Sequence, residues 1–345
     1  MTPVWPGGGW AARAVMLLAM LAALMLSIGF AVSIGEIGIP LAVTAKAVGN
    51  RLFGMDYPLS RIQEGIIWDY RMSRALLAAC CGGGLAVSGA VLQALLRNPL
   101  AEPYILGISA GASTGAVLVV VLGLGGGIVS MSGGAFAGAG LALALVAIIA
   151  AGSGGASDRI ILAGVAAAQL FNALTSYIVT TAASAEQARS IMFWLLGNLS
   201  GARWADVLLA APVVVGAVGI CLLYANALDA FHFGADAAAS LGVATGRVRL
   251  VLFAVTAAIT ATLVSLVGSI GFVGLVIPQT ARFLVGPAHA RLLPASFLIG
   301  AIFTVVADIL SRILIPQQTL PIGVVTALIG APAFAVILFR SRGAR

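Results

Sequence analysis

The chain has 345 residues, of which 61% are hydrophobic and only 8% are charged, and its mean hydropathy is +1.13. Soluble domains carry about 25% charged residues, so this composition excludes a soluble fold. A helix crosses ~30 Å of hydrocarbon with about 20 apolar residues, and the apolar runs leave room for about nine to eleven spans. The runs are unbroken and lack a period of two, which favours membrane helices over a barrel of strands.

Basic residues outnumber acidic ones, 18 to 11, for a formal net charge of +7. All but one are arginines that stand singly between apolar runs, so topology and local contacts explain them better than a nucleic-acid-binding face. The three cysteines lie in apolar runs, and His232 and His289 stand alone, so no metal or haem ligand set is predicted. Lys46 is followed by Ala47, not by the Ser or Thr of a phosphate-binding loop, so this chain is not expected to hydrolyse ATP.

The apolar runs predict one all-α transmembrane domain over residues 1–345, with about ten spans. The expected spans cover residues 14–34, 75–96, 104–122, 134–151, 159–181, 206–225, 248–267, 272–286, 294–314 and 321–339. The first run is longer than the apolar region of a signal peptide and is therefore counted as a span. Residues 35–74 are expected to form the longest aqueous loop, and a second polar stretch, 226–247, separates the sixth span from the seventh.

The distribution of basic residues bears on the orientation of the chain. An even number of spans places both termini on the same side of the membrane. With the N-terminus inside, slightly more basic residues fall on the cytoplasmic side than outside, in the direction of the positive-inside rule. Both termini are therefore expected in the cytoplasm.

Glycines recur at a spacing of four residues at the start of two expected spans. They are Gly107, Gly111 and Gly115 in the third span, and Gly134 and Gly138 in the fourth. Small residues at this spacing allow helix backbones to approach closely where lipid provides no hydrophobic driving force. The pattern predicts tight helix packing and carries no functional assignment.

A series of longer motifs identifies a family. The motifs are RMSR (71–74), GGLAVSGAVLQ (83–93), NPLAEP (98–103), LGISAGA (106–112), RIILAGVAAAQ (159–169), FWLLGNLSG (193–201), LGV (241–243), GFVGLVIP (271–278) and LPIGVVTALIGAP (320–332). In this order, over residues 60–340, the chain resembles the FecCD-type permeases of ABC importers for ferric siderophores, haem and cobalamin. Ser73 and Gln279 stand where the family usually has Pro and His, so no role of that His transfers to this chain.

The resemblance implies a type II ABC importer permease that works as a homodimer in the bacterial inner membrane, surrounded by lipid. A translocation path would follow the dimer axis, and a periplasmic binding protein would deliver the substrate. Two separate ATPase subunits would bind ATP and Mg²⁺, so the permease itself would be no enzyme and would hold no cofactor. Nucleic acid is not among the implied partners.

The resemblance also implies two contact sites. A cytoplasmic coupling segment at about 228–246 would meet the ATPases through Asp236, Ala237, Ser240, Leu241 and Gly242, although its composition fits a solvated loop equally well. Three arginines, Arg71, Arg74 and Arg312, match those that dock the binding protein in the vitamin B12 permease. Guanidinium groups suit carboxylates on a partner, but Arg at a helix end is also a common interfacial anchor. Asp308 lies four residues before Arg312 and predicts an ion pair within one helix.

Polar side chains within the spans are candidates for the substrate path. They are Gln93, Gln169, Asn172, Ser176 and, in an amphipathic segment before the sixth span, Arg189. Hydrogen bonds between helices explain the uncharged four as well as a path does, and a headgroup contact explains Arg189 as well as an anionic substrate does.

These observations favour an importer of an iron chelate. Haem is preferred because the segment around Arg189 resembles haem-importing members, a ferric siderophore comes next, and cobalamin is the alternative. A secondary transporter would need carboxylates inside the membrane and inverted repeats, and Asp308 is the only acid well inside an expected span. An intramembrane enzyme would need a constellation of His, Asp or Glu in the spans, which the sequence lacks.

Overall fold

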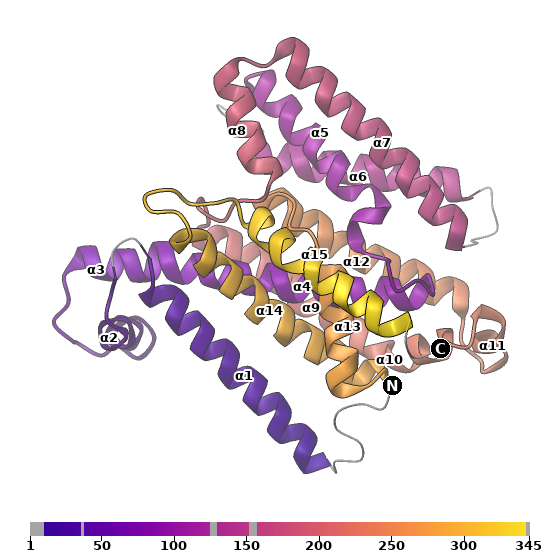
Figure 1. The fold of residues 1–345 in the computed structure, drawn as a ribbon, viewed down its shortest axis with the longest axis horizontal. Helices are drawn as coiled ribbons and strands as arrows, with labels where there is room; N and C mark the ends of the chain where they lie inside the picture. The colour runs from indigo at the N-terminus through magenta and orange to yellow at the C-terminus, as the bar shows by residue number, and fades with distance from the viewer. Residues whose placement is uncertain (1–9, 36–37, 125–129, 152–156, 343–345) are drawn as a thin grey trace.

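The computed structural model describes residues 10–35, 38–124, 130–151 and 157–342. Its long helices are arranged as a bundle, with shorter helices in other directions between and beside them (Figure 1). They are α1 (Trp10–Ser33), α2 (Leu41–Phe53), α3 (Arg61–Gly65), the π-helix η1 (Ile66–Met72), α4 (Ser73–Leu95), the 3₁₀-helix η2 (Pro103–Leu106), α5 (Ile108–Val121), α6 (Met131–Ala151), α7 (Ser157–Ala182), α8 (Ala185–Leu195), α9 (Trp204–Leu223), α10 (Ala225–Phe231), α11 (Ala235–Ser240), α12 (Thr245–Val267), α13 (Val273–Val285), α14 (His289–Ile313) and α15 (Ile322–Arg342). Among these residues an isolated bridge between Ile315 and Gln318 is the only β-pairing.

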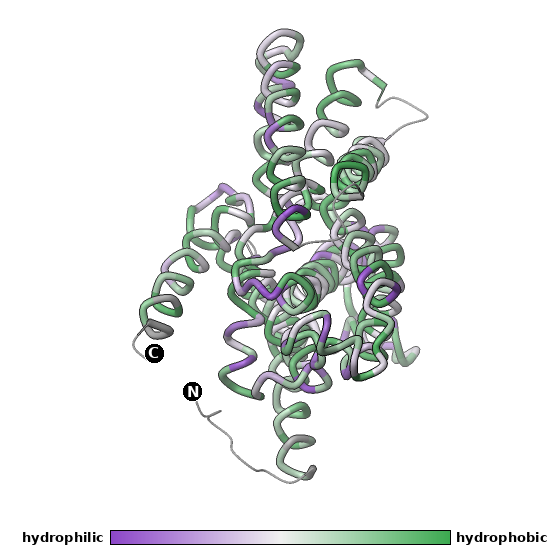
Figure 2. Tube along the Cα trace, turned by 90° about the vertical axis from the view of Figure 1, so that its right-hand side faces the viewer, coloured by the Kyte–Doolittle hydropathy of each residue, from purple (hydrophilic) through white to green (hydrophobic). Residues whose placement is uncertain are grey.

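The all-α membrane class expected from the sequence is confirmed. Seven segments of the described chain are long and apolar enough to cross a membrane, and α5, α13 and the apolar part of α15 are shorter apolar helices. Each of the ten expected spans overlaps one of these helices, several of which begin before the expected range. Polar positions gather in the connections between them (Figure 2).

The stretch 35–74, expected as a long aqueous loop, is largely helical. It contains α2, α3 and η1, and the helix that continues as α4 begins at Arg61 rather than at residue 75. Ser60 starts this helix with a reciprocal capping box, in which its hydroxyl accepts from the backbone N–H of Gln63. The low hydropathy of residues 35–74 conceals these helices, because helices that bury one face do not need a continuous apolar run.

The π-helix η1 lies inside this continuous helix, directly before Ser73. The Ser73 hydroxyl is buried and donates to the carbonyl of Asp69 at 2.6 Å, and the Ser73 N–H bonds to the carbonyl of Tyr70. Within η1 the ring of Trp68 stacks on Trp204 at the start of α9, with centroids 4.8 Å apart. With Ser73 in the place where the family usually has Pro, the start of α4 therefore remains helical and keeps these hydrogen bonds.

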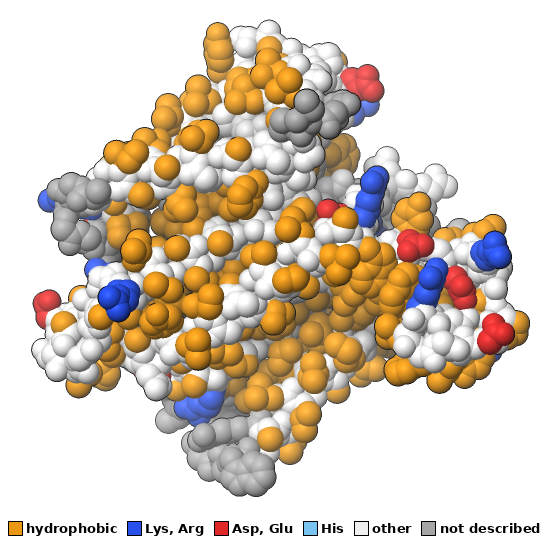
Figure 3. Space-filling view, turned by 180° about the vertical axis from the view of Figure 1, so that it is seen from behind, with side chains coloured by type: hydrophobic (Ala, Val, Ile, Leu, Met, Phe, Trp, Pro, Cys, Tyr) orange, Lys and Arg blue, Asp and Glu red, His pale blue; other side chains and the backbone are white. Residues whose placement is uncertain are grey.

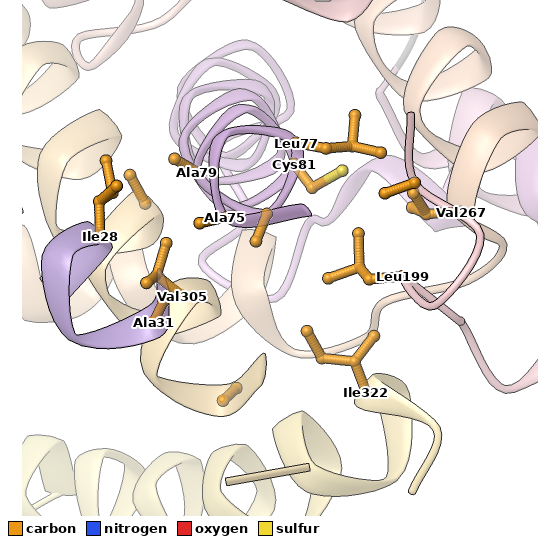
Figure 4. Close-up of a cluster of buried hydrophobic side chains, with 14 of the residues drawn as sticks. Ile28, Ala31, Ala75, Leu77, Ala79, Cys81, Leu199, Val267, Val305 and Ile322 are labelled. Atoms are coloured by element: carbon orange, nitrogen blue, oxygen red, sulfur yellow. The ribbon is translucent and has the colours of Figure 1, made fainter. Parts of the chain in front are cut away.

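The core is centred on α4, which is buried along most of its length. Figure 4 shows its small and apolar side chains enclosed by residues from α1, α12, α14, α15 and the connection before α9. The residues in view include Ala75, Leu77, Ala79 and Cys81 of α4 and Ile28, Ala31, Val267, Val305, Leu199 and Ile322 around them. Because α4 is surrounded by helices, it fixes the relative positions of the rest of the bundle.

Glycines set the closest helix contacts. A Cβ at Gly82 would collide with the Gly300 carbonyl of α14, and one at Gly89 would collide with the Gly274 carbonyl of α13. The glycines expected to pack tightly do so as well, since Gly111 faces Gly138 in the contact between α5 and α6. The tight packing predicted from the four-residue spacing is thus confirmed.

The ends of the bundle carry its short helices. Figure 1 places α2 and α3 at one end and α10 and α11 at the other, while α5 to α8 form a group along one side. Hydrophobic side chains cover much of the face seen in Figure 3, and charged side chains gather toward its ends. This distribution fits a molecule that contacts hydrocarbon around its middle and water at both ends.

Candidate docking, coupling and path sites

The three arginines expected to dock the binding protein line one surface pocket of about 260 Å³, here called the arginine pocket. Its lining residues are Gly35, Tyr70, Arg71, Arg74, Ser200, Arg312 and Thr319. The pocket lies at the end of the bundle where α1 and α14 finish and α4 begins. The structure thus brings together residues that are far apart in sequence.

Asp308 is the shared partner of two of these arginines. Its Oδ1 lies 2.8 Å from both Nε and Nη2 of Arg74, and its Oδ2 lies 3.2 Å from Nη2 of Arg312, an ion pair without hydrogen-bond geometry. The expected pair within α14 is confirmed, and the longer-range pair to Arg74 is new. Since the Asp308 side chain is 1% exposed, the two guanidinium groups compensate a buried carboxylate.

Two arginines of the arginine pocket also bind the carbonyl groups at the end of α1. Arg71 donates through Nη1 to the carbonyls of Val32 and Ser33, at 2.9 and 3.1 Å, and Arg312 donates to those of Ile34 and Ala31, at 2.9 and 3.0 Å. Carbonyls in the last turn of a helix lack partners within the helix, and cations there also interact favourably with the helix dipole. These arginines therefore hold the end of α1 in place and leave only their outer edges toward the pocket.

The expected coupling segment folds as two short helices, α10 and α11. Gly234, at φ 106°, joins them, and Gly242, at φ 85°, ends α11. In α11 Ala238 is buried, whereas Asp236 and Ser240 are exposed, and Leu241 beyond its end is 70% exposed. Of the expected contact residues, Ala237 alone is half-buried. The segment thus presents an exposed apolar side chain among polar ones at its tip.

A hydrogen-bonded pair that the sequence analysis missed fastens α10 to α14. One carboxylate oxygen of Asp229 lies 2.6 Å from Nδ1 of His289 and 2.9 Å from its backbone nitrogen, whose N–H it accepts. His232 approaches the same imidazole, with ring centroids 6.0 Å apart. The two partners are 60 residues apart, and no local pattern in the sequence signals the pair.

Gln93, expected on the substrate path, lies instead in a buried network between α4 and α13. Its Oε1 accepts from Nη1 of Arg282 at 2.7 Å and from Nε2 of Gln279 at 3.2 Å. Its Nε2 donates to the carbonyls of Gly274 and Leu275, both at 3.3 Å. For Gln93 the geometry favours interhelical hydrogen bonding over contact with substrate. Position 279, where the family usually has His, belongs to this network.

Gln169, Asn172 and Ser176 form an exposed polar stripe on α7. They stand at positions i, i+3 and i+7 and therefore share one face of the helix. The opposite face is packed, since the hydroxyl of Thr114 in α5 donates to the carbonyl of Phe171 and lies 2.8 Å from the hydroxyl of Thr175. Arg189 is exposed on α8, which follows α7 in the chain. These four residues remain accessible to a partner or a substrate.

The sequence model of the FecCD transport family matches residues 20–340 of the chain. The chain belongs to this family. A cobalamin import system permease protein, BtuC, of Halobacterium salinarum is 40% identical over 82% of this chain and 76% of its own. An Fe(3+)-citrate import system permease protein, YfmE, of Bacillus subtilis is 36% identical over 92% of this chain and 95% of its own.

A solved structure confirms the fold of this FecCD permease. It is described as a metal-chelate type ABC transporter in an inward-facing conformation, and it covers 95% of this chain and 99% of its own at 30% identity, with a TM-score of 0.83. The relatives are permeases, so the expectation of a transport component rather than an enzyme is also confirmed. Among the described residues, no group of three His, Cys, Asp or Glu could hold a metal ion.

Proposed function

We propose that this FecCD permease is the membrane subunit of an ABC importer that carries a metal chelate into a bacterial cell by alternating access. It works as a homodimer, receives its substrate from a periplasmic binding protein and is driven by two ATPase subunits that hold ATP and Mg²⁺. Both termini lie in the cytoplasm. Membership of the family and the similarity to a metal-chelate type ABC transporter support this proposal.

The observation that carries the proposal is the way α14 connects the two expected contact sites. Its first residue, His289, is bonded to Asp229 of α10, and its residues Asp308 and Arg312 line or support the arginine pocket. An importer without its own nucleotide site must pass movement mechanically from the ATPase side to the binding-protein side. A helix bonded at both ends meets this need.

The polar stripe on α7 supports a path at a dimer axis. In the single chain Gln169, Asn172 and Ser176 are exposed although α7 is a long apolar helix. Polar groups that face lipid are costly, whereas those that line a water-filled path are common. A second copy of the chain facing α7 would enclose this stripe and leave Arg189 near its end.

The preferred substrate is an anionic iron chelate, with haem first and a ferric siderophore next. This choice rests on the exposed Arg189, whose guanidinium could pair with a substrate carboxylate. The alternative is cobalamin, which is favoured by the name of the relative that is 40% identical. A secondary transporter is disfavoured, because the carboxylate of Asp308 is already compensated by two arginines.

Reconstitution tests both class and substrate. The chain is placed in liposomes with its neighbouring ATPase, and the binding protein is added on the outer side. Uptake of haem, a ferric siderophore and cobalamin is then followed with and without ATP. A matched preparation with a catalytically inactive ATPase is the control. ATP-dependent uptake of one substrate supports the proposal and selects the substrate, whereas uptake driven by an ion gradient without ATP contradicts it.

A further inference from the structure

A second, larger pocket opens between α1, α2, η1 and α9, at the end of the bundle that also holds the arginine pocket. Its volume of about 690 Å³ lies in the range of small-molecule pockets, about 300–1,000 Å³. Its wall is apolar almost throughout, with Met25, Leu41 and Phe53 among the contributing side chains. We name it the α1–α2 pocket.

The α1–α2 pocket has a cation and an aromatic pair at its border. Lys46 lines it and lies 5.8 Å from the ring centroid of Tyr57, and among the described residues it makes no ion pair. The stacked Trp68 and Trp204 line it from the other side. Trp and Tyr gather where the hydrocarbon meets the headgroups, and a Lys at that depth can bind a lipid phosphate.

We propose that the α1–α2 pocket is a binding site for an anionic membrane phospholipid. One acyl chain fills the apolar cavity between α1 and α2, and the headgroup phosphate pairs with Lys46. The surrounding bilayer supplies this ligand, and the site's single cation on an otherwise apolar wall matches a molecule with one phosphate and long hydrocarbon chains.

The transported chelate is a poor occupant of the same pocket. A charged or strongly polar chelate would lose hydration on entering an apolar cavity, and few side chains there could replace the lost hydrogen bonds. Helix α7, which carries the exposed polar stripe, lies on the opposite side of the bundle from α1 and α2 (Figure 1). The site is therefore separate from the proposed translocation path and holds α2 against α1 through lipid.

The experiment uses the full chain in nanodiscs of equal parts phosphatidylglycerol and phosphatidylethanolamine. A phosphatidylglycerol with a photoreactive diazirine at the end of one acyl chain is the probe, and labelled peptides are mapped by mass spectrometry. Labelling should concentrate on peptides that line the pocket, from α1, α2 and η1. Labelling spread evenly over all lipid-facing helices would overturn the proposal.

Filling the pocket provides the decisive variant. Gly29 lines it from α1, and a Cβ there would meet only the Leu41 side chain, at 3.6 Å, so Gly29→Phe should fill the cavity and abolish pocket labelling. Ala45→Phe fills it from α2 and serves if the first variant does not fold. Gly140→Phe is the matched control. Gly140 is an exposed glycine of α6, and no atom lies within 4 Å of the position that its Cβ would take. Labelling that persists in both filled variants would overturn the proposal.

The headgroup contact is tested at Lys46. Lys46→Gln should lower the preference for labelled phosphatidylglycerol over labelled phosphatidylethanolamine by about fivefold, and Lys46→Arg should retain it. An unchanged preference in Lys46→Gln would remove the anionic headgroup from the proposal.

Discussion

Arg74 and Asp308 lie 234 residues apart in the chain, yet one carboxylate oxygen of Asp308 lies 2.8 Å from two nitrogens of the Arg74 guanidinium. This contact joins α4, the most enclosed helix, to α14. The second oxygen of Asp308 faces Arg312, which in turn holds carbonyls at the end of α1. One buried carboxylate thus ties three helices together at the expected docking end.

Replacing Asp308 by Asn should destabilise the protein strongly. The variant keeps the shape but leaves Arg74 and Arg312 without a counter-charge in a buried place, and breaking a buried pair in this way costs about 3–5 kcal/mol. The melting temperature of the purified permease should fall clearly. Asp236→Asn, at an exposed position on α11, is the control and should leave the melting temperature unchanged.

Docking of the binding protein should depend on Arg71. Charge reversal at Arg74 or Arg312 would place a carboxylate beside Asp308, so Arg71 is tested instead. Because Arg71 also donates to two carbonyls of α1, the melting temperature of the variant is measured alongside and should stay unchanged if α1 keeps its place. Arg71→Glu should weaken binding of the binding protein to nanodisc-embedded permease by at least about tenfold, and the remaining affinity should depend less on salt. Arg247→Glu makes the same charge change at the other end and should have no effect. If Arg71→Glu and Arg247→Glu bind the binding protein with equal affinity, Arg71 is an interfacial anchor and not a docking residue.

Leu241 should contribute to the contact with the ATPase. Its side chain is 70% exposed at the end of α11, and burial of a Leu side chain in an interface is worth about 1.5–3 kcal/mol. Leu241→Ala should therefore weaken copurification of the ATPase and lower ATP-dependent uptake without changing the melting temperature. Leu223→Ala is matched to it, since Leu223 is 84% exposed on the apolar helix α9. If both variants retain the ATPase equally, α11 is no contact site.

Replacing a packed glycine and replacing an exposed glycine by alanine should change the stability of the protein in opposite directions. Gly82→Ala introduces a Cβ against the backbone of α14 and should lower the melting temperature, because backbone atoms cannot move aside cheaply. Gly219→Ala, in α9 with no atom within 4 Å of the Cβ position, should stabilise by about 1 kcal/mol through helix propensity. Similar melting temperatures for the two variants would show that α4 and α14 are more loosely packed than described.

The apolar runs indicated where long helices lie, because a helix needs a long apolar stretch to cross a membrane. The sequence also predicted the pairing of Asp308 with Arg312, since residues four apart share a helix face. Residues 35–74 were expected to form a long aqueous loop and are largely helical, because α2 and η1 pack against α1, and Trp68 of η1 stacks on Trp204 of α9.

Other features depend on tertiary contacts that no local pattern encodes. The bonds from Arg74 to Asp308 and from His289 to Asp229 join residues that are distant in the chain. Gln93 illustrates the same limit, since its residue type fits a path and an interhelical network equally well. Its 4% exposed fraction and its contacts with Arg282 and Gln279 favour the network.

The length of α14 gives it the geometry of a lever. With 25 residues it extends about 37 Å at 1.5 Å per residue. If the His289 end is taken as the pivot, a tilt of about 5° would displace the Arg312 end by about 3 Å, comparable to the length of a hydrogen bond. The same tilt would move Gly300, about 16 Å from the pivot, by about 1.4 Å, so the bonds of Arg312 to the carbonyls of α1 would change together with the close contact between Gly300 and Gly82 of α4.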